Sequence, residues 1–262
     1  MYCKSWAVTH VGMKRDHNED SYLTDDALQL YVVADGMGGH TAGEMASATA
    51  VSVIEQEIGN SVGTENEEAR GKTRMMFSDG TSDPAIQLLT RALRMASSEI
   101  LEKSVDDTTL KGMGTTTSAM FFADGKGYLA HVGDSRIYKI SSGNITQLTT
   151  DHSLVQEQVE AGLITKEEAE RSSLKNIITR SIGFEADIDV DCESVKWKNG
   201  EHFLLCSDGL TNFVTDKEIR DIVSMKEEET ALEFLVNLAN QRGGDDNITV
   251  ILVKTHDGER PE

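Results

Sequence analysis

Short runs of β-branched and apolar residues, separated by turn residues such as Gly, Asp and Asn, dominate this chain. Runs of this kind predict β-strands. We expect strands at 6–11, 28–34, 115–123, 127–132, 136–140, 145–149, 202–206 and 248–253. Because many of these strands follow one another without an intervening helix, the sheets should be largely antiparallel.

A second pattern, with apolar residues at helical spacing, predicts a few helices. The first covers 43–58, and another begins at Asp83, an N-cap followed by Pro84 at the first helical position. Capping boxes begin at Thr165 and at Thr215. A late apolar stripe over 231–238 predicts one more helix, which Gly243 and Gly244 should end.

Two stretches stand apart from this pattern. The polar, acidic and Gly-rich stretch 59–82 predicts a loop, and the polar, helical segment 151–183 interrupts the strands as a lid would. We call the latter the flap segment. Long helices that pack on antiparallel sheets indicate an α+β fold, which we expect to form a single domain over 1–262.

The charge balance excludes several classes of partner. The 262 residues carry 45 Asp and Glu against 25 Lys and Arg, a net charge of −20. Such a chain is not expected to bind nucleic acid or an anionic membrane. A solvated acidic surface accounts for most of the excess, and bound divalent cations are a further way to neutralise carboxylates.

The three cysteines, Cys3, Cys192 and Cys206, have no metal-ligand or disulfide spacing. The N-terminus has no apolar signal region, and no run reaches the ~20 apolar residues of a membrane span. We therefore expect a soluble, cytoplasmic protein.

Carboxylates stand at the ends of several predicted strands. Asp35 and Asp208, each followed by Gly, come directly after apolar runs, Asp246 precedes another, and Asp134 follows a fourth. Each of these alone is typical of a turn. If they converge, they repel one another unless cations hold them, and oxygen donors without His or Cys favour Mg²⁺ or Mn²⁺.

Six motifs make the chain similar to a known family. They are RDHNED at 15–20, ADGMGGH at 34–40, GMGTT at 112–116, VGDSR at 132–136, SDGL at 207–210 and GDDNIT at 244–249. In this order, over about 5–254, they resemble the metal-dependent serine/threonine protein phosphatases of the 2C type in their bacterial form. The resemblance implies a four-layer fold, an antiparallel β-sandwich flanked by helices on both outer faces.

The resemblance also implies roles at matching positions. Asp35 would bridge two metal ions, and the Gly36 carbonyl would bind one of them. Asp208 and Asp246 would complete the shell of the other ion. Glu19 and Asp20 would act largely through metal-bound waters. Asp134 with Asp208 would form a third, weaker metal site. Arg15 would bind the substrate phosphate.

The implied chemistry is hydrolysis of phosphoserine and phosphothreonine by a metal-bridging hydroxide, without a phosphoenzyme. One position departs from the pattern. Many eukaryotic relatives carry His directly after the Asp-Gly pair, where this chain has Met37. His40 is a candidate for the same acid role; the alternatives are that it orders the Gly-rich turn or bonds a neighbouring carboxylate. The flap segment matches the flap of bacterial members.

Phosphorylated proteins, and a eukaryotic-type Ser/Thr kinase that modifies them, are the partners that this resemblance implies in signal transduction. Two alternatives remain. A phosphatase of a sigma-factor antagonist tends to lack the Arg-x-x-Asn-Glu-Asp element that begins at Arg15. A non-catalytic pseudophosphatase module would have lost metal-binding Asp residues, all of which are present.

Overall fold

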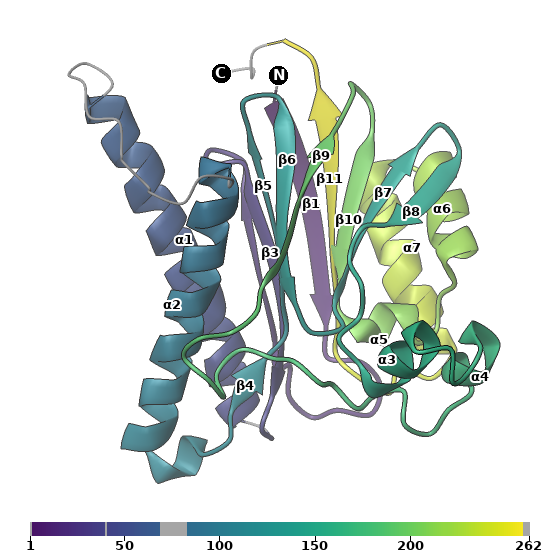
Figure 1. Ribbon diagram of the computed structural model, residues 1–262. Helices are drawn as coiled ribbons and strands as arrows, with labels where there is room; N and C mark the ends of the chain where they lie inside the picture. The colour runs from purple at the N-terminus through teal and green to yellow at the C-terminus, as the bar shows by residue number, and fades with distance from the viewer. Residues whose placement is uncertain (1, 40, 69–82, 259–262) are drawn as a thin grey trace.

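Two antiparallel sheets stacked face to face form the centre of the computed structural model, which describes residues 2–39, 41–68 and 83–258 (Figure 1). The strands are β1 Tyr2–His10, β2 Asp20–Asp25, β3 Leu30–Met37, β4 Gly114–Thr115, β5 Thr117–Ala123, β6 Lys126–Val132, β7 Arg136–Ser141, β8 Asn144–Gln147, β9 Asp191–Lys196, β10 His202–Cys206 and β11 Ile248–His256. One sheet has the order β1-β11-β10-β7-β8, and the other has the order β2-β3-β5-β6-β9, with β4 paired on β3.

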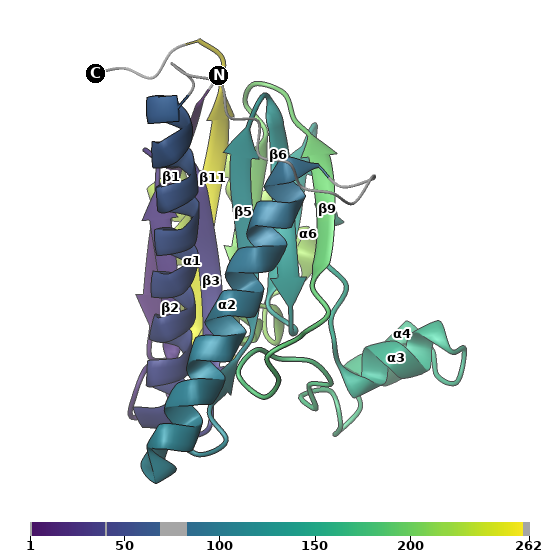
Figure 2. The same ribbon diagram turned by 60° about the vertical axis from the view of Figure 1, so that its left-hand side comes forward.

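Helices cover both outer faces of this pair of sheets. They are α1 Thr41–Glu68, α2 Pro84–Asp106, α3 Leu154–Glu160, α4 Lys166–Glu170, α5 Asp208–Thr211, α6 Asp216–Met225 and α7 Glu228–Gln241, with a 3₁₀ turn at Thr108–Leu110. Helices α1 and α2 lie against the sheet that contains β3, and α6 and α7 lie on the other side of the sandwich (Figures 1 and 2). The expected α+β sandwich, with helices on both outer faces, is confirmed.

Apolar side chains fill all three spaces between the four layers. Between the sheets the core is aromatic at its centre, where the rings of Phe122 and Phe203 meet edge to face with centroids 5.3 Å apart. Burial of apolar area is the main favourable contribution to folding. Three continuous cores therefore make the sheets a stiff support for the loops at their ends.

Edge strands and one helix end differ from the prediction. The sequence pattern did not indicate β2 or β9, which form the two edges of one sheet. Polar residues interrupt both strands, such as Thr24 in β2 and Glu193 in β9, so neither strand has an apolar run. The predicted loop at 59–82 is wrong over its first ten residues, because α1 continues to Glu68. Helix propagation needs no apolar stripe once a helix has nucleated. Residues 69–82 lie outside the described part of the chain.

The flap segment carries α3 and α4 and lies beside one end of the sandwich (Figure 2). Two isolated bridges, Ser153 with Ile178 and Thr115 with Ile182, tie the two ends of the segment to each other and to the chain before β5. The capping boxes at Thr165 and Thr215 are both present.

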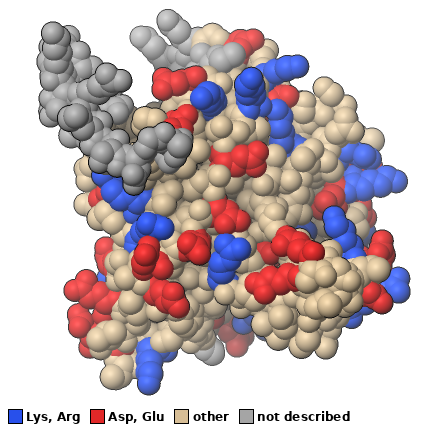
Figure 3. All heavy atoms as spheres, in the orientation of Figure 1, with Lys and Arg blue, Asp and Glu red and all other residues tan. Residues whose placement is uncertain are grey.

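Acidic and basic side chains are interspersed over the face of the molecule that Figure 3 presents. On this face the acidic excess is spread out and solvated, as the composition indicates. None of the helices in the described ranges is long and apolar enough to cross a membrane.

The core between the sheets should dominate stability. Phe203 is fully buried there, so Phe203→Ala is expected to lower the free energy of unfolding by about 3–5 kcal/mol, measured by chemical denaturation. Phe234 on α7 is 45% exposed, and Phe234→Ala should cost far less. Equal losses in the two variants would contradict this assignment of the core.

Candidate active site

Strand pairing brings the predicted site carboxylates to one end of the sandwich. Asp20 and Asp35 face each other across β2 and β3. On the other sheet, β10 ends next to the start of β11, since Cys206 pairs with Val250, so Asp208 and Asp246 lie at the same end. The hydroxyl of Ser207 donates to Asp20 Oδ2 at 2.9 Å and links the two sheets at this point.

Burial and mutual repulsion raise the pKa values of these carboxyl groups. Burial raises the pKa of Asp35 well above its ordinary value, and the charges of neighbouring aspartates, first Asp20 and then Asp208, raise it further. Burial raises the pKa of Asp20 to about 7, although hydrogen bonds from Thr249 and Ser207 partly offset this rise. Burial, followed by the nearby charge of Asp208, raises the pKa of Asp134 to about 8. Four carboxyl groups therefore share a site where ionisation of all of them is costly.

Two carboxylate oxygens in this cluster lack a partner. Asp20 Oδ1 and Asp208 Oδ1 are buried and accept no hydrogen bond. Buried polar atoms almost always have a partner in native proteins, and two such oxygens in one cluster suit a cation or a water as that partner. At the same time, no group of three or more His, Cys, Asp or Glu side chains in the described ranges could hold a metal ion directly.

The backbone around Asp35 is held closely from both sides. The carbonyl of Asp35 accepts a hydrogen bond from the amide of Thr116 at 2.9 Å. The Gly36 amide donates to the carbonyl of Glu19 at 3.1 Å. A β-carbon at Gly36 would overlap the carbonyl oxygens of Glu19 and of Gly43 at the start of α1. Only glycine permits this approach, which fixes Asp35 relative to the N-terminal loop.

Asn247 organises the loop that carries Arg15 and Glu19. Its side chain is buried, its Oδ1 accepts from the amide of Glu19 at 2.8 Å, and its Nδ2 donates to the carbonyls of Val11 and His17, both at 2.9 Å. The sequence alone assigns no role to Asn247. The only signal was its position next to Asp246 in the last motif, because hydrogen bonds over more than 225 residues of separation leave no local pattern.

Arg15 lies at the mouth of the site, with half of its side chain exposed. Its guanidinium donates to Asp246 Oδ2 at 2.7 Å, so it already has a carboxylate partner. A planar guanidinium has donors on more than one edge, and the exposed part of Arg15 can still meet an anion from solvent.

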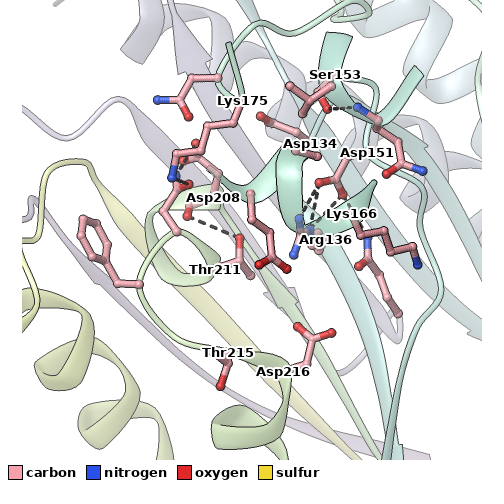
Figure 4. Close-up of a pocket in the computed structure, with 18 of the residues that line it drawn as sticks. Asp134, Arg136, Asp151, Ser153, Lys166, Lys175, Asp208, Thr211, Thr215 and Asp216 are labelled. Atoms are coloured by element: carbon pink, nitrogen blue, oxygen red, sulfur yellow. Dashed lines mark hydrogen bonds and ion pairs between the residues drawn. The ribbon is translucent and has the colours of Figure 1, made fainter. Parts of the chain in front are cut away.

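A cavity of about 670 Å³ opens beside the cluster, between the flap segment and the chain that forms α5 and α6. Asp134 and Asp208 line it together, as Figure 4 shows. On its floor the guanidinium of Arg136 donates to both oxygens of Asp151, at 2.6–3.1 Å. This pair neutralises one of the carboxylates that line the cavity, which Lys166, Lys175 and Lys217 also line.

The structure brings together most of the predicted site residues: Arg15, Asp20, Asp35, Gly36, Asp134, Asp208 and Asp246. Glu19 is half-buried beside them. His40 lies outside the described residues, and its acid role stays a prediction. Cys206 is buried in β10, and burial raises the pKa of its thiol to about 12, which makes it unsuitable as a nucleophile.

Comparison with known proteins identifies the family. The family model described as protein phosphatase 2C matches residues 12–252. The protein phosphatase PhpP of Streptococcus pneumoniae is 39% identical over 257 residues, which are 95% of this chain and 96% of the relative.

Solved structures agree with the sequence relatives. The serine/threonine phosphatase PstP/Ppp of Mycobacterium tuberculosis superposes with a TM-score of 0.85 at 31% identity, over 98% of this chain and all of the other. The catalytic domain of the serine/threonine protein phosphatase PstP in complex with two manganese ions gives a TM-score of 0.82 at 31% identity, over 98% and 99% of the two chains. The chain therefore belongs to the protein phosphatase 2C family and is a protein serine/threonine phosphatase.

Proposed function

We propose that the cluster around Asp35 is a catalytic centre that hydrolyses phosphoserine and phosphothreonine in proteins with the help of Mn²⁺ or Mg²⁺. The observation that carries this proposal is the gathering of four carboxyl groups at one end of the sandwich, with raised pKa values and two oxygens that lack partners. Asp20 and Asp134 are buried there, and Asp35 and Asp208 are half-buried. Such a cluster is stable when cations neutralise it.

The donors in the cluster fit a pair of hard cations. We assign Asp35 and the carbonyl of Gly36 to one ion, and Asp35, Asp208 and Asp246 to the other. Ions of this kind keep several waters. Asp35, Asp208 and Asp246 do not form a ready group of three ligands in the described ranges, so we infer that they draw closer together when the second ion binds. The relative with two manganese ions supports the pair.

Two further assignments follow the same chemistry. Glu19 and Asp20 are proposed to act through waters on the cations. Asp134 and Asp208, which line the cavity together, are proposed to hold a third and weaker ion.

The cations and the residues of this chain would have separate roles in the reaction. When bound, paired divalent cations lower the pKa of a water and offset charge on phosphoryl oxygens. The guanidinium of Arg15 binds phosphate oxygens from the solvent side of the site. No described cysteine competes as a nucleophile, since burial raises the pKa values of Cys3, Cys192 and Cys206. This argues against a phosphocysteine intermediate. Direct attack by water, without a phosphoenzyme, is what the resemblance to the family implies, and we propose it for this chain.

Substrates of this centre are proteins that a Ser/Thr kinase has phosphorylated, and we propose that the phosphatase opposes such a kinase. Neither alternative gains support. The carboxylates that a pseudophosphatase would lack are all present, and the element from Arg15 to Asp20 that sigma-factor antagonist phosphatases tend to lack is present too.

Turnover of a phosphothreonine peptide tests the proposal. Activity should be lost in EDTA and return on addition of Mn²⁺, and Asp208→Asn should abolish it, because the variant weakens a cation ligand. Asp124→Asn is the matched control, since Asp124 lies in the turn after β5, at the opposite end of that strand from the site. Full activity in thoroughly chelated protein would rule out the metal-dependent centre.

Arg15 should act on phosphate binding. Arg15→Ala is expected to raise KM for a phosphopeptide with a smaller fall in kcat, because the contact exists in both the ground state and the transition state. A charge-assisted hydrogen bond is worth roughly 1.5–3 kcal/mol, or about 10- to 150-fold in kcat/KM. Lys14→Ala, at an exposed neighbour, should leave steady-state kinetics unchanged. An unchanged KM in Arg15→Ala would show that Arg15 does not bind the phosphate and serves only as the partner of Asp246.

Metal-free protein should lose stability as pH rises. The pKa values of Asp20 and Asp134 are raised to about 7 and about 8 in the folded chain, so these groups keep protons that the unfolded chain releases near pH 4. Their stabilising contribution is full below the unfolded pKa and is lost as pH rises through the folded pKa. Calorimetry in EDTA should therefore give a lower Tm at about pH 8 than at about pH 5.

Asp134→Asn isolates one of these groups. In EDTA it should raise Tm more at about pH 8 than at about pH 5, because it removes a charge that is costly only where Asp134 ionises. Asp124→Asn should change Tm equally at both values. The account is wrong if Asp134→Asn gives the same shift at the two pH values.

A further inference from the structure

The cavity beside the carboxylates separates the flap segment from α5 and α6, and one polar contact crosses it. The ammonium of Lys175, on the flap segment, donates to Asn212 Oδ1 at 2.8 Å. Within the described ranges this is the one hydrogen bond or ion pair that joins residues 154–177 to residues 208–225. Figure 4 places Lys175 next to Asp208.

Asn212 connects Lys175 to the carboxylate cluster through Asp208. Its Nδ2 donates to Asp208 Oδ2 at 2.9 Å, while its backbone amide bonds the carbonyl of the same residue at 2.8 Å. The two bonds to Asp208 are local and would fit an ordinary helix end. The bond to Lys175 spans 37 residues and is not explained by capping of α5.

The hydrogen bonds of Asn212 determine which carboxylate oxygen of Asp208 is left without a partner. Because Oδ2 is occupied by the amide of Asn212, Oδ1 is the oxygen that stays buried without a partner. A charged donor on the amide oxygen polarises the amide and strengthens its N–H as a donor. Lys175 therefore strengthens the very bond that fixes the carboxylate plane.

We propose that Lys175 and Asn212 are positioning residues that couple the place of the flap segment to the orientation of the Asp208 carboxylate. With Lys175 seated on Asn212, Oδ1 is presented to the cluster. The link to catalysis rests on the proposed function, in which Asp208 binds a cation. Since coupling between two sites is reciprocal, a cation on Asp208 must in turn hold the flap segment in place.

The ammonium also has an opposite effect, since its charge repels a cation nearby. Two substitutions separate the effects. Lys175→Met removes both the charge and the donor, whereas Lys175→Gln removes the charge and keeps a donor. Lys166→Met is the matched control, because Lys166 is on the same segment, lines the same cavity and is exposed.

Titration calorimetry of Mn²⁺ into protein without substrate is the first readout. Loss of one hydrogen bond should weaken Mn²⁺ binding about 3- to 10-fold in Lys175→Met, with Lys175→Gln and Lys166→Met close to wild type. Asn212→Ala should weaken binding at least as much, and Lys175→Met should add nothing to it in the double variant. Unchanged or tighter binding in Lys175→Met overturns the coupling.

Hydrogen exchange of backbone amides is the second readout and does not depend on the metal. In EDTA, Lys175→Met should speed exchange both in 171–178 and in 208–212, whereas Lys166→Met should not. Mn²⁺ should slow exchange in 171–178 of the wild type but not of Lys175→Met. If the wild type binds no Mn²⁺, the proposed function fails, and exchange in EDTA alone decides whether the contact couples the two segments. Faster exchange in only one of the two segments of Lys175→Met would refute the coupling.

Discussion

The cost of gathering carboxylates in one partly buried place is the constraint on which the rest of this structure depends. Like charges at short range repel, and burial removes the water that would screen them. Flexible loops would relieve the repulsion by moving apart. Here Asp20 begins β2, Asp35 lies near the end of β3 and Asp208 follows β10. The other ends of these strands are anchored in three apolar cores. The stiffness of the sandwich therefore holds together groups that would otherwise separate. A cation that binds there offsets the repulsion between them.

Polar contacts complete what the sheets begin. Ser207 joins the two sheets through Asp20, and its hydroxyl also accepts from the amide of Thr249 at 3.0 Å. Asn247 holds the N-terminal loop against the start of β11 through three bonds. These residues bind no substrate in our account. They fix the distances between sheets and loop, because a carboxylate cluster assembled from separate segments is only as well placed as the contacts between them.

Much of this arrangement was predictable, because strand ends can be located from apolar runs. Asp35 and Asp208 follow apolar runs that belong to β3 and β10, so their convergence needed only the stacking of the two sheets with these strand ends at the same side. The edge strand β2 and the extension of α1 to Glu68 lack an apolar pattern and were missed. The partners of Asn247 and Lys175 were not predictable either, because their bonds join segments far apart in the chain and one sequence contains no record of such pairs.

Net charge would not have located the site, since carboxyl groups on the surface and carboxyl groups in the cluster have pKa values shifted in opposite directions. On the surface, hydrogen bonds from Arg242 lower the pKa of Glu218 to about 2, and that carboxylate stays ionised and solvated. In the cluster, burial raises the pKa of Asp134 to about 8. Most of the −20 charge belongs to the first kind and affects solubility and encounter with partners. The few carboxylates of the second kind gain from a bound cation, because only they are held where water cannot stabilise their charge.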